Sequence, residues 1–314
     1  MSKLVCMGDC IIDLLPSAPK SLTYTAKAGG APANVCAAVA KLGGEAYYLG
    51  KLSDDVFGKY LLDQLRKNNV NTAYTVVDGR YKTGLAAVDL YENGDRDFFF
   101  FRDNPADANL YPEEVDESIF EKDDVLHFCS VSLMESPTKH AHERALGYAL
   151  KHGTLVSFDV NVRLNLWKDA DRLRAAIDDF LPYVDFVKVT DDELGFVTGC
   201  CCEVQGVAAL FDKAPRAKLV FVTKGEKGSA VYDRSLTLLT YPAVGKTVVD
   251  TTGAGDCFIG SIIYKLLRGE AALDINHIDE AMKFAARACA FVISRKGGAE
   301  AMPTLAETEN FDER

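Results

Sequence analysis

Two glycines and an aspartate stand at the entrance of an expected helix in the stretch Asp250-Thr-Thr-Gly-Ala-Gly-Asp256. The apolar residues that follow recur every three or four positions and predict a helix beginning between Gly253 and Gly255. The first N–H groups of a helix have no partner within it, and its dipole is positive at that end. Because glycine has no side chain, a phosphate could approach several of these N–H groups, so the stretch predicts an anion site.

Asp256 points to the chemistry of this anion site. A carboxylate beside a bound phosphate would repel it, unless the carboxylate takes a proton from an attacking hydroxyl. Donors for developing charge next to a base for the acceptor are the requirements of phosphoryl transfer. In the alternative interpretation the glycines shape a turn and an aspartate caps the helix. A cap precedes the first turn, which suits Asp250 better than Asp256.

Other polar residues interrupt apolar runs further along the chain. Asp13 lies in CIIDLL, and Lys188 lies in FVKVT, where its burial would be costly unless it faced an anion. Asn161 and Arg163 follow the run LVSFDV, at the end of a strand where open α/β sheets bind ligands. The planar guanidinium of Arg163 suits oxyanions. The simpler alternatives are a cap for Asp13 and a surface arginine for Arg163.

The elements that must position these residues alternate along the chain. Strands are predicted at 4–8, 46–50, 124–130, 154–160, 184–190 and 218–223, and helices at 32–44, 56–69, 137–151 and 169–180. The segment before Asp13 is interpreted as part of the first strand. Alternation over this length predicts an α/β fold with a doubly wound, mostly parallel sheet covered on both faces.

Residues 83–102 break this alternation and predict a hairpin turned at Asn93-Gly94, with 23–28 as a partner strand. Its four phenylalanines, 98–101, should alternate between faces, so at least two rings need cover. We expect a small β lid that packs either over a cleft or against a second copy of the chain.

Composition restricts the class of protein. Among 314 residues, 35 Lys and Arg against 46 Asp and Glu give a net charge of −11, which disfavours nucleic acid and anionic membranes as partners. The start of the chain lacks the features of a signal peptide, and no apolar run approaches a membrane span, so we expect a cytoplasmic protein. The adjacent Cys200–Cys202 lack zinc-ligand spacing, the other cysteines suit buried thiols, and His140 and His142 are expected at the surface.

Two motifs carry a family resemblance. AGGAPANVCAAVAKLGG (28–44) and DTTGAGDCFIGS (250–261) resemble the two signatures of the ribokinase/PfkB sugar kinases, and the likeness extends from residue 8 to residue 303. SFDVNVRLNLW (157–167) and VKVTDDEL (187–194) are most similar to the fructokinase and aminoimidazole-riboside-kinase branch. The resemblance implies one ribokinase-like domain over 1–314, a β lid formed by about 14–28 and 83–104, and a homodimer through that lid.

The resemblance also implies roles for individual residues. Those of the reaction centre are Asp256 as the base, the backbone N–H groups of Gly253, Ala254 and Gly255 as the anion hole, and Arg163 as a clamp. Those of the sugar site are Asp13, Gly29, Gly30, Asn34, Phe100 and Arg163. Those of the ATP site are Asn161, Lys188, Glu193, Thr223, Gly225, Gly253 and Gly255.

Metal ions are implied at two places. Glu193 would orient Mg²⁺ through water, although its neighbours Asp191 and Asp192 could share that task. Members that need K⁺ hold it through loop carbonyls, which correspond here to Asp250, Thr252, Val292, Arg295 and Gly297.

The expected function is therefore that of an ATP- and Mg²⁺-dependent sugar kinase acting on a primary hydroxyl, with fructose and its 6-phosphate as the leading pair. Ribokinase-like members carry a lysine in the early motif where this chain has Ala31-Pro32, and an asparagine at Lys188, which points away from ribose. 2-Keto-3-deoxygluconate and aminoimidazole riboside remain alternative substrates. A non-catalytic sugar-binding regulator is an alternative of another class. A dinucleotide-binding fold is disfavoured, because no G-x-G-x-x-G follows the first strand.

Overall fold

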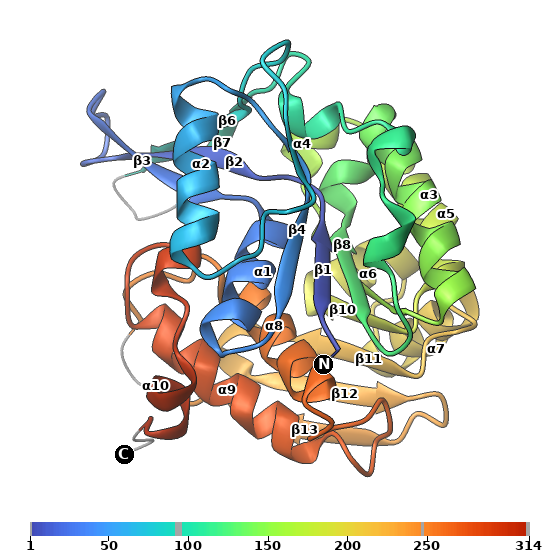
Figure 1. Ribbon diagram of the computed structural model, residues 1–314. Coiled ribbons are helices and arrows are strands. Elements are labelled where there is room, and N and C mark those ends of the chain that lie inside the picture. The colour runs from blue at the N-terminus through green and yellow to red at the C-terminus, as the bar shows by residue number, and fades with distance from the viewer. Residues whose placement is uncertain (1, 92–95, 246–247, 312–314) are drawn as a thin grey trace.

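The computed structural model describes residues 2–91, 96–245 and 248–311 of the chain. Within this part, nine strands form the main sheet in the order β13-β12-β11-β10-β9-β8-β1-β4-β5 (Figure 1). These strands are β1 (Leu4–Met7), β4 (Ala46–Leu52), β5 (Thr75–Val77), β8 (Val125–Cys129), β9 (Leu155–Asp159), β10 (Phe186–Thr190), β11 (Leu219–Thr223), β12 (Ser229–Asp233) and β13 (Leu238–Tyr241). Only β12 and β13, at one edge, run antiparallel to their neighbours in this sheet. The mostly parallel sheet that the sequence predicts is confirmed.

Helices cover both faces of this sheet, because both faces of its strands are apolar. In β1, Leu4 and Cys6 enter one core layer, whereas Val5 and Met7 enter the other. The first layer includes α1 (Ala31–Lys41), α2 (Val56–Lys67), α8 (Ala254–Leu267) and α9 (Asp279–Ile293). The second includes α3 (Pro137–His152), α5 (Ala170–Phe180), α6 (Asp191–Thr198) and α7 (Glu203–Lys213). The short helices α4 (Leu164–Trp167) and α10 (Leu305–Glu309) complete the set of described α-helices. The doubly wound arrangement is confirmed.

A smaller sheet in the order β3-β2-β6-β7 forms the lid. Its strands are β2 (Ile11–Pro16), β3 (Tyr24–Gly29), β6 (Leu85–Leu90) and β7 (Arg96–Phe101). They lie above the carboxyl ends of β1 and β4 in Figure 1. The predicted hairpin strands pair as expected, with the turn Asn93-Gly94 outside the described residues. Two predictions were wrong. The 23–28 segment pairs with β2 rather than with the hairpin, and β2 is a separate strand rather than part of the first.

The phenylalanine run divides between the two faces of β7. Phe99 and Phe101 are 55% and 64% exposed, whereas Phe100, between them, is half-buried. The side chain of Phe98 lies outside the described residues. The expected alternation is present, and a face with two uncovered rings remains on the single chain.

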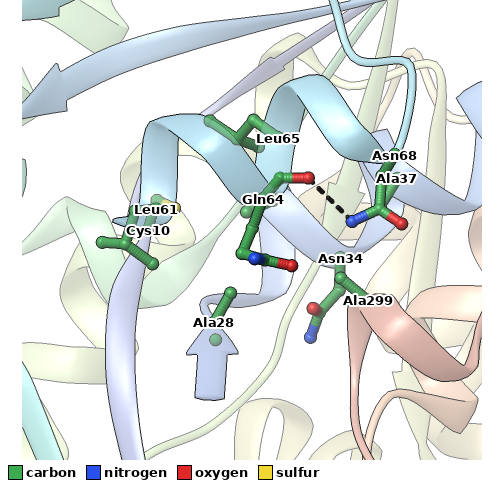
Figure 2. A pocket seen from close by; sticks show the side chains of 11 residues that line it. Cys10, Ala28, Asn34, Ala37, Leu61, Gln64, Leu65, Asn68 and Ala299 are labelled. Carbon is green, nitrogen blue, oxygen red and sulfur yellow. Dashed lines mark hydrogen bonds between the residues drawn. The ribbon is translucent and has the colours of Figure 1, made fainter. Parts of the chain in front are cut away.

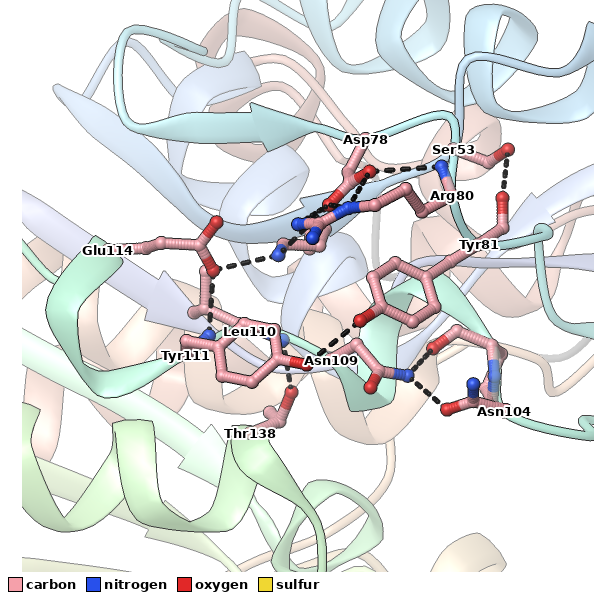
Figure 3. Close-up of polar contacts among 12 residues, drawn as sticks. Ser53, Asp78, Arg80, Tyr81, Asn104, Asn109, Leu110, Tyr111, Glu114 and Thr138 are labelled. Atoms are coloured by element: carbon pink, nitrogen blue, oxygen red, sulfur yellow. Dashed lines mark hydrogen bonds and ion pairs between the residues drawn. The ribbon is translucent and has the colours of Figure 1, made fainter.

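Two of the connections between the lid and the body, those that enter and leave the β6–β7 pair, are held by Lys51 at the end of β4. Its Nζ lies 3.5 Å from Asp78 in the incoming connection and 2.8 Å from Glu114 in the outgoing one. The rings of Tyr81 and Tyr111 flank the same ammonium, at 5.5 and 4.9 Å, and their hydroxyls are 2.9 Å apart (Figure 3). The Lys51 side chain is fully buried. We call these five residues the Lys51 cluster.

The expectation that both histidines of α3 lie at the surface was wrong for His142. His140 is exposed, but His142 faces the core, where its Nδ1 donates to the Thr138 carbonyl at 2.8 Å and its ring meets Phe128. Burial lowers the pKa of His142 to about 4. Residues two apart on a helix face different sides, which is why one histidine is buried and the other is not.

The cysteines also divide by environment. Cys6, Cys36 and Cys129 are buried as expected, whereas Cys289 is half-buried. Cys201 and Cys202 are exposed between α6 and α7, beside the half-buried Cys200. Across the described part of the chain, no single helix is long and apolar enough to cross a membrane; α6 and α7 meet that test together, as a pair bent by 58°.

Candidate active site

The entrance of α8 leaves its first N–H groups without a side-chain cap. Gly253 is the N-cap residue, with a left-handed φ of 80°, and no side chain bonds the helix there. A Cβ at Gly253 would lie 3.1 Å from Met302 Cε, and one at Gly255 would lie 3.1 Å from Lys188 Nζ. The predicted helix start is confirmed, and side chains at these two positions would crowd the surroundings.

Asp250 does not cap this helix, contrary to the alternative interpretation. Its carboxylate accepts from the Thr252 backbone N–H at 3.0 Å and from the Thr252 hydroxyl at 2.7 Å. The other oxygen accepts from the Gly297 N–H at 3.3 Å. Asp250 therefore joins the loop before α8 to the loop after α9. Arg295, at the start of that second loop, donates its backbone N–H to the carbonyl of Val292 in the last turn of α9, at 3.1 Å.

Asp256 is the third residue of α8 and turns inward. Asn34 on α1 donates its Nδ2–H to Asp256 Oδ2 at 2.8 Å. Burial raises the pKa of Asp256 to about 7; Asp159 adds to the increase, while the Asn34 hydrogen bond, Lys188 and Arg163 oppose it. A carboxylate that titrates near neutrality is poised to take a proton from a hydroxyl.

Asp13 is a second carboxylate of this kind, on lid strand β2. Burial raises its pKa to about 7, and the Asp9 carboxylate adds to the increase. A Cβ at Gly29 on β3 would overlap the Asp13 carboxylate. Gly30 has a φ of 105°, and a Cβ there would overlap the Asp9 carbonyl. These glycines thus make room for the carboxylate and for the start of α1.

Lys188 on β10 pairs with Asp159 on β9. Its Nζ lies 3.0 and 3.2 Å from the two carboxylate oxygens, and both side chains are buried. Burial by itself would lower the pKa of Lys188, but Asp159, Glu193 and Asp256 hold it above its usual value. Asp159 therefore supplies an anion of the kind that the burial of Lys188 requires. Sequence reasoning missed Asp159, although an acid in the apolar run LVSFDV is the same signal that singled out Lys188.

Glu193, at the start of α6, is bonded to the loop that follows β9 and to the end of β10. Its Oε2 accepts from the Thr190 N–H at 2.8 Å, and Thr190 Oγ1 accepts from the Glu193 N–H at 3.1 Å, which forms a capping box. Its Oε1 accepts from the Val162 N–H at 2.9 Å. In the same loop, Asn161 is buried with a left-handed φ of 42°, and Arg163 is exposed. Asp191 and Asp192 are exposed in the first turn of α6.

The other residues predicted for the site lie on β11, after β11 and on the lid. Thr223 ends β11, with its hydroxyl 3.5 Å from the Val189 carbonyl, and Gly225 follows with a left-handed φ of 53°. Phe100 lies on the lid strand β7. Gly29 and Asn34 also line a small pocket between β3, α1 and α2, which has room for about one water molecule (Figure 2).

The fold therefore brings one group together at the carboxyl ends of the strands. The charges of these residues influence one another there, although they come from three strands, a loop and a helix far apart in sequence: Asp13, Asp159, Arg163, Lys188 and Asp256. A glycine-lined helix end, a carboxylate that titrates near neutrality and a buried cation next to both suit the transfer of a phosphoryl group to an alcohol. Among the described residues, no three His, Cys, Asp or Glu side chains are grouped so as to hold a metal ion by themselves.

Comparison with known proteins gives a consistent result. The family model of pfkB family carbohydrate kinases matches residues 1–305. Fructokinase-2 of Oryza sativa subsp. japonica is 37% identical over 98% of this chain and 93% of its own, and probable fructokinase-5 of Arabidopsis thaliana is 36% identical over 98% and 96%.

Solved structures are similar over nearly the whole chain. Fructokinase from Vibrio cholerae O395 with fructose, ADP and calcium has a TM-score of 0.90 at 32% identity, covering 99% of both chains. Fructokinase from Xylella fastidiosa with bound ATP has a TM-score of 0.88 at 30% identity, covering 98% of this chain and 97% of its own. Aminoimidazole riboside kinase from Salmonella enterica has a TM-score of 0.87 at 27% identity, covering 99% of both. The fold is thus the ribokinase-like α/β fold.

Proposed function

Because the chain belongs to the pfkB family of carbohydrate kinases, we propose that it is an ATP-dependent fructokinase that converts D-fructose to D-fructose 6-phosphate. The observation that carries the proposal is the position of Asp256, which is hydrogen-bonded to Asn34 and lies in the first turn of a helix whose entrance is lined by glycine. Fructose as the sugar is supported by relatives named fructokinase at 35–37% identity.

In the proposed reaction, the primary hydroxyl of the sugar gives its proton to the Asp256 carboxylate while its oxygen attacks the γ-phosphorus of ATP. The bond from phosphorus to the bridging oxygen breaks, and ADP leaves. The N–H groups of Gly253, Ala254 and Gly255 stabilise the charge that develops on the transferred group. Lys188 and Arg163 add positive charge on the phosphate side, and Asn161, Thr223 and Gly225 bind the nucleotide.

On the sugar side, Asp13 takes two hydroxyls, Gly29 and Gly30 allow close approach of the backbone, and Phe100 covers the ring. Asn34 offers both a donor and an acceptor to the sugar. Asp13 is suited to this role because its carboxylate is fixed against Gly29 on the neighbouring strand. 2-Keto-3-deoxygluconate and aminoimidazole riboside are the alternative substrates, and the second is favoured by the likeness to aminoimidazole riboside kinase.

The proposed reaction calls for a divalent ion on the phosphate side of this site. Glu193 is the carboxylate that would hold Mg²⁺, through water, and the phosphates of ATP would supply further oxygens, as is usual for this ion. Bound Mg²⁺ neutralises charge on the phosphates. The hydrogen bond from Gly297 to Asp250 joins the two loops whose carbonyls, at Asp250, Thr252, Val292, Arg295 and Gly297, would hold K⁺.

We further propose a single cytoplasmic domain that forms a homodimer through the lid. The two uncovered rings of β7, Phe99 and Phe101, support that assembly. A second copy of the chain is the partner, and neither nucleic acid nor a membrane is involved.

A screen of ADP release tests the function. With ATP and Mg²⁺, we expect fructose to release ADP faster than ribose, 2-keto-3-deoxygluconate, glucose or aminoimidazole riboside. Asp256→Asn should lower the rate by roughly 10²–10⁴-fold with an unchanged circular dichroism spectrum. Asp179→Asn, at an exposed aspartate of α5, is the control and should keep full activity.

Three results would count against the proposal. Sugar binding in calorimetry without ADP release would favour the non-catalytic regulator. A faster reaction with another sugar would replace fructose. Full activity in Asp256→Asn would remove the base from the mechanism.

A further inference from the structure

We propose that Asn34 is a positioning residue for the reaction: it holds one oxygen of Asp256 so that the other oxygen, Oδ1, receives the proton of the sugar hydroxyl. This inference rests on the proposed kinase function. It gives Asn34 a second role, the orientation of Asp256, in addition to binding the sugar.

The first observation is a hydrogen bond between helices. Asn34 on α1 is 6% exposed, and its Nδ2 donates to Asp256 Oδ2 across the α1–α8 contact at 2.8 Å. Gly260 on α8 allows the two helices to approach closely, because a Cβ there would lie 2.9 Å from Ala38 Cβ. A bond between two closely packed helices fixes the plane of the Asp256 carboxylate and leaves Oδ1 for the acceptor alcohol.

The second observation is the other end of the same amide. Asn34 Oδ1 is buried and has no hydrogen-bond partner among the described residues. The amide cannot be reversed without placing its oxygen against the Asp256 carboxylate. A buried acceptor without a partner is costly, so this oxygen is suited to a donor that arrives with the ligand, such as a sugar hydroxyl. One amide would then touch both the base and the sugar.

The third observation is that Gly298 lies against the Asn34 amide and limits its movement. A Cβ at Gly298 would lie 3.0 Å from Asn34 Oδ1 and 3.2 Å from Nδ2. Figure 2 shows the Asn34 amide near Ala299 and turned away from Gln64 of α2. Gly298→Ala should therefore displace the amide without changing its chemistry.

The fourth consideration is the charge around Asp256. Groups from other elements act on it: Asp159 on β9, Lys188 on β10, Arg163 after β9, Asp13 on β2, and the buried thiols of Cys6 and Cys129. These groups act through space, whereas Asn34 donates a hydrogen bond to the carboxylate itself. Such a bond stabilises the ionised form, so its loss raises the pKa of the base.

The kinetic experiment compares kcat and KM from pH 5 to pH 9 in the wild type, Asn34→Ala and Asn34→Asp. We expect the acidic limb of kcat to move up by roughly one pH unit in Asn34→Ala, which corresponds to the loss of one hydrogen bond to a charged group. Asn34→Asp keeps the shape of the side chain but places a second carboxylate beside Asp256. The acidic limb of kcat should therefore move up at least as far as in Asn34→Ala. Gln64 on α2 lines the same small pocket as Asn34, so Gln64→Ala is the control, and the acidic limb of its kcat profile should stay at the wild-type pH.

A second measurement does not depend on turnover. Carboxyl ¹³C NMR of aspartate-labelled protein follows the titration of Asp256, with its signal assigned by Asp256→Asn. The midpoint should rise by a similar amount in Asn34→Ala, and by a smaller amount in Gly298→Ala.

The two ideas fail in different ways. If the wild type phosphorylates sugars but Asn34→Ala changes only KM, with an unmoved kcat profile, Asn34 is a sugar ligand and nothing more. If no sugar is phosphorylated, the proposed function fails, and the NMR midpoint still decides the inference: an equal midpoint in the wild type and in Asn34→Ala overturns it.

Discussion

At the scale of single residues, the site depends on carboxylates that the fold makes less acidic. Burial is the first cause of the raised pKa in both Asp13 and Asp256, which titrate at about 7. The ordinary value for aspartate is about 3.9, so both groups take up protons on folding between pH 4 and pH 7. Such groups favour the folded state at low pH, and this contribution is lost as the pH rises through 7.

A stability prediction follows for Asp256. Asp256→Asn removes a carboxylate that is costly to ionise in the folded protein, so the variant should have a higher thermal midpoint than the wild type at pH 8. Its advantage should shrink as the pH falls from 7 towards 4, because the wild-type carboxyl is then protonated in the folded state. Differential scanning calorimetry at several pH values measures this difference.

The exposed Asp179 provides the control for that experiment. Asp179→Asn should show no such dependence on pH. A constant difference between Asp256→Asn and the wild type at all pH values would mean that Asp256 titrates at an ordinary pKa.

At the scale of elements, the lid strand β7 has one half-buried face and one exposed aromatic face. Alternation along β7 exposes Phe99 and Phe101 on one face and leaves Phe100 half-buried on the other. Two large aromatic side chains exposed on the same face of a strand form an apolar patch, and such patches often mark protein–protein interfaces. Such a strand suits a second copy of the chain.

We therefore expect Phe99→Ser/Phe101→Ser to sediment as a monomer at micromolar concentrations at which the wild type is a dimer. Removing two large apolar contacts weakens association, because aromatic side chains contribute strongly to interfaces. Leu238→Ser, at an exposed residue of edge strand β13, is the matched control. A wild type that is monomeric throughout, or a double variant that stays dimeric, contradicts assembly through this face.

At the scale of the whole molecule, the Lys51 cluster connects the lid to the main sheet. Its ammonium lies between a carboxylate and a tyrosine ring from each of the two connections, and it is fully buried (Figure 3). A buried cation with two carboxylate partners makes the incoming and outgoing connections depend on one residue of β4.

Lys51→Ala should therefore lower the free energy of unfolding by about 3 kcal/mol in urea titrations, because it leaves Glu114 without its buried partner, although Asp78 keeps Arg80. Lys283→Ala removes an exposed lysine that also has two acidic partners, and should change the free energy of unfolding far less, because water screens exposed ion pairs. Equal effects of the two substitutions would show that the cluster does not hold the connections.

The sequence by itself determined the layered sheet and the entrance of α8. Apolar runs and helical spacing depend on residues close together in the chain, so β8 to β11 and the start of α8 could be predicted within a few positions. The separate strand β2 was missed, because the break at Gly8 depends on a left-handed φ of 140° that no local apolar pattern reveals. The same holds for His142, whose burial depends on which face of α3 meets the sheet.

Tertiary structure decided which polar groups meet. The pairing of Lys188 with Asp159 and the bond from Asn34 to Asp256 join residues 29 and 222 positions apart. Local spacing carries no information on such contacts, since they arise where strands end together and where two helices pack. The raised pKa values have the same origin, because burial and neighbouring charges exist only once the chain is folded.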